Sequence, residues 1–380
     1  MNIMSKQLIL KGLPLFSILC TIGTLIGFAV DRVSGRAISN FQFFKQGLTP
    51  DGIHYELRAL RFIGINDYEA LSSIRAQYEP TGFSVTEYFL NPESWEAALV
   101  DPRLLFPLLS VIFVKFLGLA GFFIIPMACF ALLVLSPLYF NYKFLDNGQK
   151  QFSFVLVILL MSSFYNKFNI LANTTDGLSA FLIVFLTLLL MKNYYKRESR
   201  WDYFLIPFFC LLACMTRQNE IYVSGLVIIF FLNKFSKDRK VATVIALNSF
   251  IFVSSWLIFS FARYKNYAII TNSSGQELGG SSLINDIIGL FLKFPQTLSI
   301  EFFQLFVRDI GVFMLLIIAI LVSFPLKRIT LVQQFFAWIL FSGIILTSLN
   351  GSFGSGFRYA IPSIFIATFV ILENWNKQNV

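Results

Sequence analysis

Apolar runs of about 15 to 22 residues recur along this chain, and they limit how it can fold more than any other feature. A run of roughly 20 apolar residues is long enough to cross a membrane as a helix. Of the 380 residues, 56% are hydrophobic and only 13% are charged, and the mean hydropathy is +0.70. These features predict an all-α protein surrounded mostly by lipid. We expect a polytopic transmembrane helical bundle in which residues 1–380 form a single membrane domain.

The runs and the breaks between them predict about ten spans. Their approximate bounds are 12–30, 119–140, 152–168, 178–192, 203–216, 220–233, 241–262, 309–326, 331–349 and 359–374. The first run resembles a signal peptide, but no small-residue cleavage site follows it, so we expect an uncleaved helix. The run Leu104–Leu117 is short and interrupted by Lys115, and we expect it to lie at or dip into the membrane interface. If it spans instead, every later helix changes direction.

The positions of Lys and Arg predict the orientation of the bundle. A formal charge of +9 would suggest nucleic acid in a soluble protein, but basic clusters in short loops mark the cytoplasmic side of a membrane protein. Such clusters lie at 143–150, 192–200, 234–240 and 327–328. Two long segments, 31–118 and 263–308, and short turns at 169–177, 217–219 and 350–358 then lie on the outer face. We expect both chain ends inside, in a bacterial inner (cytoplasmic) membrane.

The outer segment 31–118 is predicted to carry short amphipathic helices, such as Ile53–Ile63, on the membrane surface. Asp51 lies in TPDG, which is typical of a turn. It is either a solvated turn residue or a general base, because a carboxylate at the mouth of an apolar cavity can accept a proton from a hydroxyl nucleophile. His54, the only histidine, is expected to be a solvated loop residue. The four cysteines show no metal spacing, so no metal ligand is assigned.

Further polar residues stand at the predicted outer ends of spans, where an ionisable group is costly unless it is paired or functional. They are Arg103, Asp176, Arg217, Glu220, Arg358 and Tyr359. Asp176 either caps the following helix or accepts a substrate hydrogen bond. Arg217 and Glu220 either form a local salt bridge or bind substrate, and each of the other two arginines either snorkels or holds an anion. Arginine matches phosphate geometry better than lysine, so the set fits a phosphate-bearing lipid.

Five short motifs follow one another along the chain. Asp51, Tyr55 and Ala59 form an Asp-x-x-x-Tyr-x-x-x-Ala pattern; DPRLLFPLL, TTDGLSAFLIVFL, LLACMTRQNEIY and GFRYAIP follow it. Their order resembles the GT-C superfamily of integral-membrane glycosyltransferases, which includes the aminoarabinose transferases of lipid A and the protein O-mannosyltransferases. The chain departs from many members by having Asp-Gly in place of Asp-Glu in the first motif, which leaves the need for a divalent metal open.

The resemblance implies an inverting transfer of a sugar from a polyprenyl-phosphate donor to a lipid, glycan or protein acceptor on the outer face. Asp51 would be the general base, with Asp67 as its rival. The implied substrate-binding residues are Tyr55, Arg103, Asp176, Arg217, Glu220, Arg358 and Tyr359. The expected partners are the lipid-linked sugar, membrane lipids and the acceptor, not nucleic acid.

Two other functions stay open. An O-antigen polymerase or ligase would rely on Arg and His in a late outer loop, and 263–308 contains no His. A flippase or transporter for lipid-linked sugars would often show paired halves, and none is visible in the sequence.

Overall fold

The computed structural model describes residues 15–26, 49–79, 84–91, 103–145, 150–172, 174–194, 201–217, 220–233, 240–255, 257, 283–323, 330–350 and 360–378. Within this part of the chain the regular structure is entirely helical, which confirms the all-α prediction. The chain forms two compact units. Unit 1 comprises Met1–Val30, Ala128–Ile170 and Leu290–Val380, and unit 2 comprises Asp31–Met127 and Leu171–Gly289. That residues 1–380 act as one membrane domain stays a prediction.

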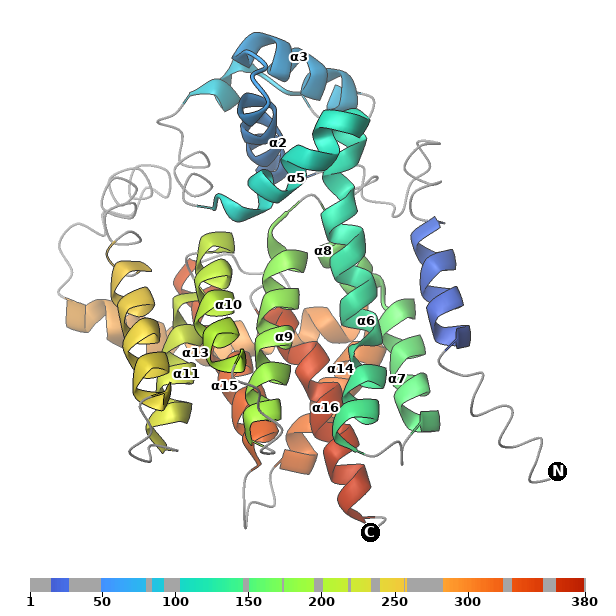
Figure 1. The fold of residues 1–380 in the computed structure, drawn as a ribbon, viewed down its shortest axis with the longest axis vertical. Coiled ribbons are helices and arrows are strands. Elements are labelled where there is room, and N and C mark those ends of the chain that lie inside the picture. The colour runs from blue at the N-terminus through green and yellow to red at the C-terminus, as the bar shows by residue number, and fades with distance from the viewer. Residues whose placement is uncertain are drawn as a thin grey trace. The chain divides into compact units, whose positions relative to one another are not determined.

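Unit 2 begins with a group of short helices. They are α2 (Pro50–Phe62), α3 (Asp67–Tyr78), η3 (Glu87–Leu90), α5 (Leu105–Leu117) and η4 (Gly118–Phe123). The prediction of a turn at TPDG is wrong, because these residues begin α2. The side chain of Thr49 accepts a hydrogen bond from the Gly52 N–H, and Pro50 occupies the first helical turn, where it loses no intrahelical bond. Helix α2 packs against both α3 and α5 (Figure 1).

The chain reverses direction after α5. Gly118 has a φ of 60°, a conformation that favours glycine. Phe106 and Phe122 would lie about 24 Å apart on one continuous helix, yet their ring centroids are 4.9 Å apart. The turn is tight, because a Cβ on Gly121 would clash with the Phe113 carbonyl oxygen. Helix α5 is therefore a separate short element and η4 folds back on it.

The rest of unit 2 is a set of longer apolar helices. They are α9 (Asp176–Tyr194), α10 (Asp202–Thr216), α11 (Ile221–Asn233) and the helix Lys240–Ser255. Helices α9 and α10 lie side by side (Figure 1), and α10 also contacts α11 and α5. An ion pair closes each end of the α9–α10 hairpin: Arg217 with Asp176 at one end, and Lys192 with Asp202, at 2.9 Å, at the other. These pairs hold the two helices in register along about 24 Å of α9.

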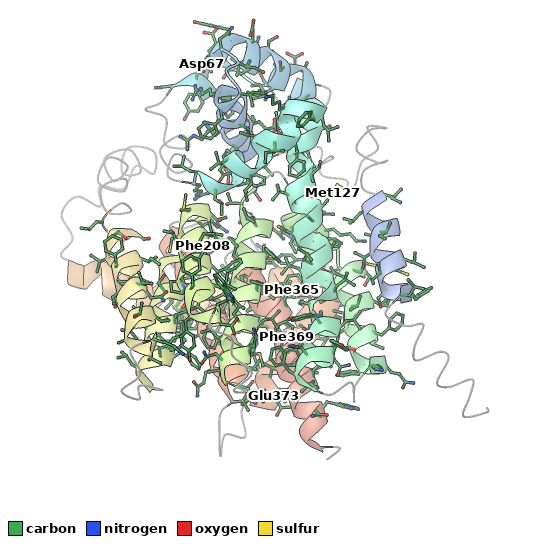
Figure 2. All side chains as sticks on the ribbon, in the orientation of Figure 1. Asp67, Met127, Phe208, Phe365, Phe369 and Glu373 are labelled. Atoms are coloured by element: carbon green, nitrogen blue, oxygen red, sulfur yellow. The ribbon has the colours of Figure 1, made fainter. Side chains whose placement is uncertain are left out.

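Unit 1 is built around the last helix of the chain. Its elements are Leu15–Ile26, most of α6 (Ile124–Phe144), α7 (Lys150–Ser162), α8 (Phe164–Ile170), most of α13 (Leu283–Arg308), α14 (Ile310–Ser323), α15 (Leu331–Asn350) and α16 (Ile361–Gln378). Helix α16 contacts α7, α14 and α15. Phe365 and Phe369 lie on α16 (Figure 2). Both are fully buried, and Phe369 stacks on Phe140 of α6 at 4.6 Å.

Two parts of unit 1 differ from the sequence-based expectation. The span predicted at 152–168 is broken at Ser163 into α7 and α8. The segment 263–308, expected to be a long loop, contains the 26-residue helix α13 over its second part. The sequence interpretation missed α13 because Asp286, Lys293 and Glu301 interrupt its apolar run. Its apolar residues nevertheless recur at helical spacing, which allows a helix to form.

Two helical stretches among the described residues are long and apolar enough to cross a membrane, Leu105–Phe144 and Asp176–Asn193. The first contains the reversal at Gly118. Shorter apolar helices of 10–17 residues lie at Leu15–Ile26, Lys150–Ser162, Asp202–Thr216, Tyr222–Leu232, Lys240–Ser255, Ile310–Ser323 and Leu331–Ile345. A protein with membrane-spanning helices is compatible with these lengths, and the bundle of about ten spans stays a prediction.

Candidate functional site

A group of buried polar residues gathers in unit 2 where α9 begins, α10 ends and α11 begins. It consists of Thr174, Asp176, Ser179, Arg217 and Glu220, each with no more than 3% of its surface exposed, and we call it the 176–220 cluster. Arg217 Nη1 donates a hydrogen bond to Asp176 Oδ1, and Thr174 Oγ1 donates to Asp176 Oδ2 at 3.0 Å. Ser179 Oγ donates to Glu220 Oε1 at 2.5 Å. The guanidinium of Arg217 is therefore bound to one carboxylate, and the second carboxylate, Glu220, is bound to Ser179 in the same cluster.

Local chain geometry explains why the cluster forms. Arg217 has an extended backbone (φ −147°, ψ 125°), which ends α10, while its N–H still bonds to the Ala213 carbonyl. Because α9 and α10 are antiparallel, this end of α10 meets the beginning of α9. Asp176 is the first residue of α9, where the helix dipole favours a negative charge. The motifs TTDG and TRQNE are thus neighbours in space.

The buried ion pair of the cluster links residues 41 positions apart in the chain. The sequence analysis considered a local pair between Arg217 and Glu220, whereas the salt bridge in the structure joins Arg217 to Asp176. Removing one partner of such a pair leaves an uncompensated buried charge, which typically costs about 3–5 kcal/mol. The two side chains therefore depend on each other for their stability.

A second buried contact in unit 2 joins the first two motifs. Arg103 Nη1 donates a hydrogen bond to the hydroxyl oxygen of Tyr55 at 2.9 Å, across 48 residues of sequence. Both side chains are buried. The Tyr55 ring also packs edge-on against Phe106 at 5.6 Å. The structure therefore brings together two residues that the sequence analysis selected separately.

Asp51 lies in the first turn of α2 and is half-buried. Asp51, Tyr55 and Ala59 are spaced four residues apart, so they share one face of the helix. Tyr55 and Ala59 are fully buried on that face. The prediction for His54 is wrong: its ring is buried and packs at 5.2 Å against Phe89 of η3, because the helical conformation of TPDGIHY turns it away from solvent.

Glu56 and Asp309 are carboxylates with defined partners that were not selected from the sequence. Glu56 on α2 is fully buried and accepts a hydrogen bond from Gln77 Nε2 at 3.3 Å. Asp309, in unit 1, lies between α13 and α14 and accepts hydrogen bonds from Ser163, Tyr165 and Val312. A signal for Asp309 was present, since an Asp directly before an apolar run is typical of a helix N-cap.

Arg358 and Tyr359, which the sequence analysis assigned to substrate binding, lie outside the described residues. Among the residues that the structure describes, no group of three or more His, Cys, Asp and Glu side chains could hold a metal ion. Comparisons with protein-family models, with curated proteins and with solved structures found no match to this chain.

Proposed function

We propose that the protein is an integral-membrane glycosyltransferase of the GT-C type, which transfers a sugar from a polyprenyl-phosphate donor to a lipid, glycan or protein acceptor. One observation carries the proposal: residues from separate GT-C-like motifs are joined in pairs by buried hydrogen bonds. Tyr55 meets Arg103, and Asp176 meets Arg217. If the four short motifs matched the GT-C pattern only by chance, their residues would have no reason to contact one another in the interior.

The two arginines have different buried partners. Arg217 is bound to the carboxylate of Asp176. Arg103 donates a hydrogen bond to the hydroxyl oxygen of Tyr55 on α2, the helix that begins with Asp51. Arg103 is a candidate to stabilise the developing charge of the departing polyprenyl phosphate, because a guanidinium matches phosphate geometry. Arg217 with Asp176 and Glu220 is the better candidate to hold hydroxyl groups of the sugar.

The proposed reaction is a single inverting displacement. The carboxylate of Asp51 takes the proton of the acceptor hydroxyl, and the acceptor oxygen bonds to the anomeric carbon. The bond from that carbon to the phosphate oxygen breaks, and polyprenyl phosphate leaves with the bonding electrons. Asp51 suits this role because it is half-buried at the first turn of a helix whose next turns hold Tyr55 and Ala59 in the interior.

The proposed location is a bacterial inner membrane, with the site on its outer face. Helix α9 is about 28 Å long, close to the roughly 30 Å thickness of the hydrocarbon core. Apolar side chains are exposed on several helices, including Leu15, Leu19 and Ile22 on the first one. Large exposed apolar surfaces are rare in water and ordinary in lipid. These observations support a multi-pass bundle.

The test of this function is a deletion strain examined by mass spectrometry of its lipid-linked sugars and surface glycans. We expect a lipid-linked sugar to accumulate and the glycan that receives it to lose that sugar. Wild-type protein should restore the glycan, whereas Asp51→Asn produced at the same level should not. Unchanged lipid-linked sugars and unchanged glycans in the deletion strain would contradict the proposal.

A further inference from the structure

Buried polar atoms that form no hydrogen bond within the described part of the chain gather at the 176–220 cluster. They are Glu220 Oε2, Thr175 Oγ1 and the hydroxyl of Tyr222. Thr175 has none of its surface exposed, and Glu220 has 3%. Buried polar atoms without partners are rare in folded proteins, because burial removes the water that would otherwise bind them. Three such atoms at one point therefore indicate a group that binds there.

The other acceptors of the cluster are already bound by protein donors. Asp176 accepts from Arg217 at one carboxylate oxygen and from Thr174 at the other. Glu220 accepts from Ser179 at Oε1 only. An ionised carboxylate accepts hydrogen bonds and donates none, so Glu220 Oε2 requires a donor from outside the cluster.

A sugar carries the groups that these atoms require. Its hydroxyls can donate to Glu220 Oε2, and they can both donate to and accept from the hydroxyls of Thr175 and Tyr222. The Tyr222 hydroxyl lies near the Glu220 carboxylate without forming a regular hydrogen bond to it, so both can face the same ligand. An ordered water is the other group that satisfies buried polar atoms in this way. The two differ in what a substitution would do.

The fold connects the cluster with the proposed site of chemistry. Asp51 lies in the first turn of α2, and α2 packs on α5. Helix α5 in turn contacts α10, and Arg217 directly follows the last residue of α10. All these elements belong to unit 2. A sugar in the cluster would therefore lie within the same unit as the proposed general base.

The charges of the cluster restrict the kind of sugar. Two carboxylates, Asp176 and Glu220, accompany one guanidinium, which is itself bound to Asp176. A carboxylate on the sugar would meet like charges in a buried place, where repulsion is weakly screened. We propose that the 176–220 cluster, with Thr175 and Tyr222, binds hydroxyl groups of the donor sugar, and that this sugar carries no carboxylate. This inference rests on the proposed function and adds the class of sugar.

Matched lipids test the inference on the full chain in detergent micelles. The probes are undecaprenyl phosphate and its conjugates with glucose, galactose and mannose, each beside the conjugate of the corresponding uronic acid. In each pair a hydroxymethyl group is replaced by a carboxylate. We expect at least one neutral conjugate to bind about tenfold more tightly than undecaprenyl phosphate, and its uronic acid to lose that gain.

The outcomes separate this inference from the proposed function. If undecaprenyl phosphate binds and no sugar increases the affinity, the cluster is not a sugar site while the proposed function stands. If a uronic acid conjugate binds as tightly as its neutral counterpart, the assignment of the sugar class is wrong. If none of the lipids binds, both proposals fail.

Glu220→Gln tests the carboxylate directly. The variant keeps an acceptor for Ser179 and replaces Oε2 by a nitrogen that cannot accept. It should lose most of the gain from the neutral sugar and keep the affinity for undecaprenyl phosphate. Glu373→Gln is the matched control, because Glu373 is also buried and accepts from a hydroxyl, that of Thr330, in unit 1. This control should change neither affinity, and equal losses in the two variants would overturn the assignment.

Thr175→Val distinguishes a sugar from an ordered water and does not depend on how Glu220→Gln folds. Valine keeps the shape and removes a hydroxyl that binds nothing in the described part of the chain. The unfolding temperature should stay the same or rise, while the affinity for the neutral sugar conjugate should fall about tenfold. Unchanged sugar affinity would overturn the assignment, and a lower unfolding temperature beside it would identify an ordered water as the partner.

Discussion

Asp176 in unit 2 and Asp309 in unit 1 each stand at the beginning of an apolar helix, yet they satisfy their charge in different ways. Asp176 is 97% buried and faces the guanidinium of Arg217. Asp309 is half-buried and faces dipoles: its Oδ1 accepts from the Val312 N–H at 3.1 Å, and its Oδ2 accepts from Ser163 Oγ at 2.5 Å and the Tyr165 N–H at 3.2 Å. One carboxylate needs a counter-charge, and the other needs only correctly placed donors.

This difference distinguishes a candidate functional site from a contact that only stabilises the fold. A buried ion pair is seldom the most stable way to fill an interior, so its presence in unit 2 suits a functional role. The carboxylate of Asp309 caps α14 and also binds the first turn of α8, and in this way holds the break between α7 and α8. We therefore expect substitutions at Asp51 and in the 176–220 cluster to affect catalysis or to leave a buried charge unpaired, and substitutions at Asp309 to affect stability alone.

The largest effect is expected at Asp51. Asp51→Asn keeps the size of the side chain and removes the proton acceptor, so the rate of sugar transfer should fall roughly 10²- to 10⁴-fold. The unfolding temperature of the purified protein should stay unchanged. Transfer at the wild-type rate by this variant would remove Asp51 from the catalytic role.

Asp67→Asn is the matched control for that experiment. Asp67 also lies in the first turn of a helix, α3 (Figure 2), but its side chain is 47% exposed and pairs with Arg61 at 2.6 Å on the surface. Such exposed pairs contribute little. We expect Asp67→Asn to keep its activity, and a loss confined to this variant would transfer the role of base to Asp67.

The next largest effect is expected from breaking the buried pair of the 176–220 cluster. Arg217→Met should lower the free energy of unfolding by about 3–5 kcal/mol, because it leaves the buried carboxylate of Asp176 without the guanidinium. The double variant Asp176→Leu, Arg217→Met removes both charges and should recover much of that loss without recovering activity. Denaturation in detergent measures the free energy of unfolding of the single and the double variant. Additive losses in the double variant would mean that the two side chains are not coupled.

A smaller effect is expected at Asp309. Asp309→Asn retains one acceptor oxygen, but its amide nitrogen cannot accept from Ser163 or Tyr165. The expected cost is about 1–2 kcal/mol of stability, with kcat and KM for sugar transfer unchanged. A loss of activity greater than the loss of folded protein would break the distinction between the two units.

The last comparison is between the two ion pairs of the α9–α10 hairpin. Lys192 is 26% exposed, although its partner Asp202 is buried, so solvent screens only one of the two charges. Lys192→Met should cost about 1–2 kcal/mol, less than Arg217→Met, where both partners are buried. Equal costs in the two unfolding experiments would show that burial does not distinguish the two ion pairs.

The sequence alone determined three of the longer helices of unit 2, α9, α10 and α11, and the residue types of the candidate site. The spans predicted at 178–192, 203–216 and 220–233 agree with α9, α10 and α11 within two residues at each end. Helices of this kind can be predicted from the sequence, because an apolar run and the polar residues that end it are local features. For the same reason Asp176, Arg217 and Glu220 were recognised as charges at helix ends.

The tertiary structure decided which of these residues meet. Arg217 pairs with Asp176 across 41 residues, Arg103 binds Tyr55 across 48, and Asp309 holds the helix break at Ser163 across 146. His54 was read as solvated and is buried by η3, which packs on it from a later segment. The local sequence shows where burying a charge would be costly. The packing of distant helices determines which partner offsets that cost.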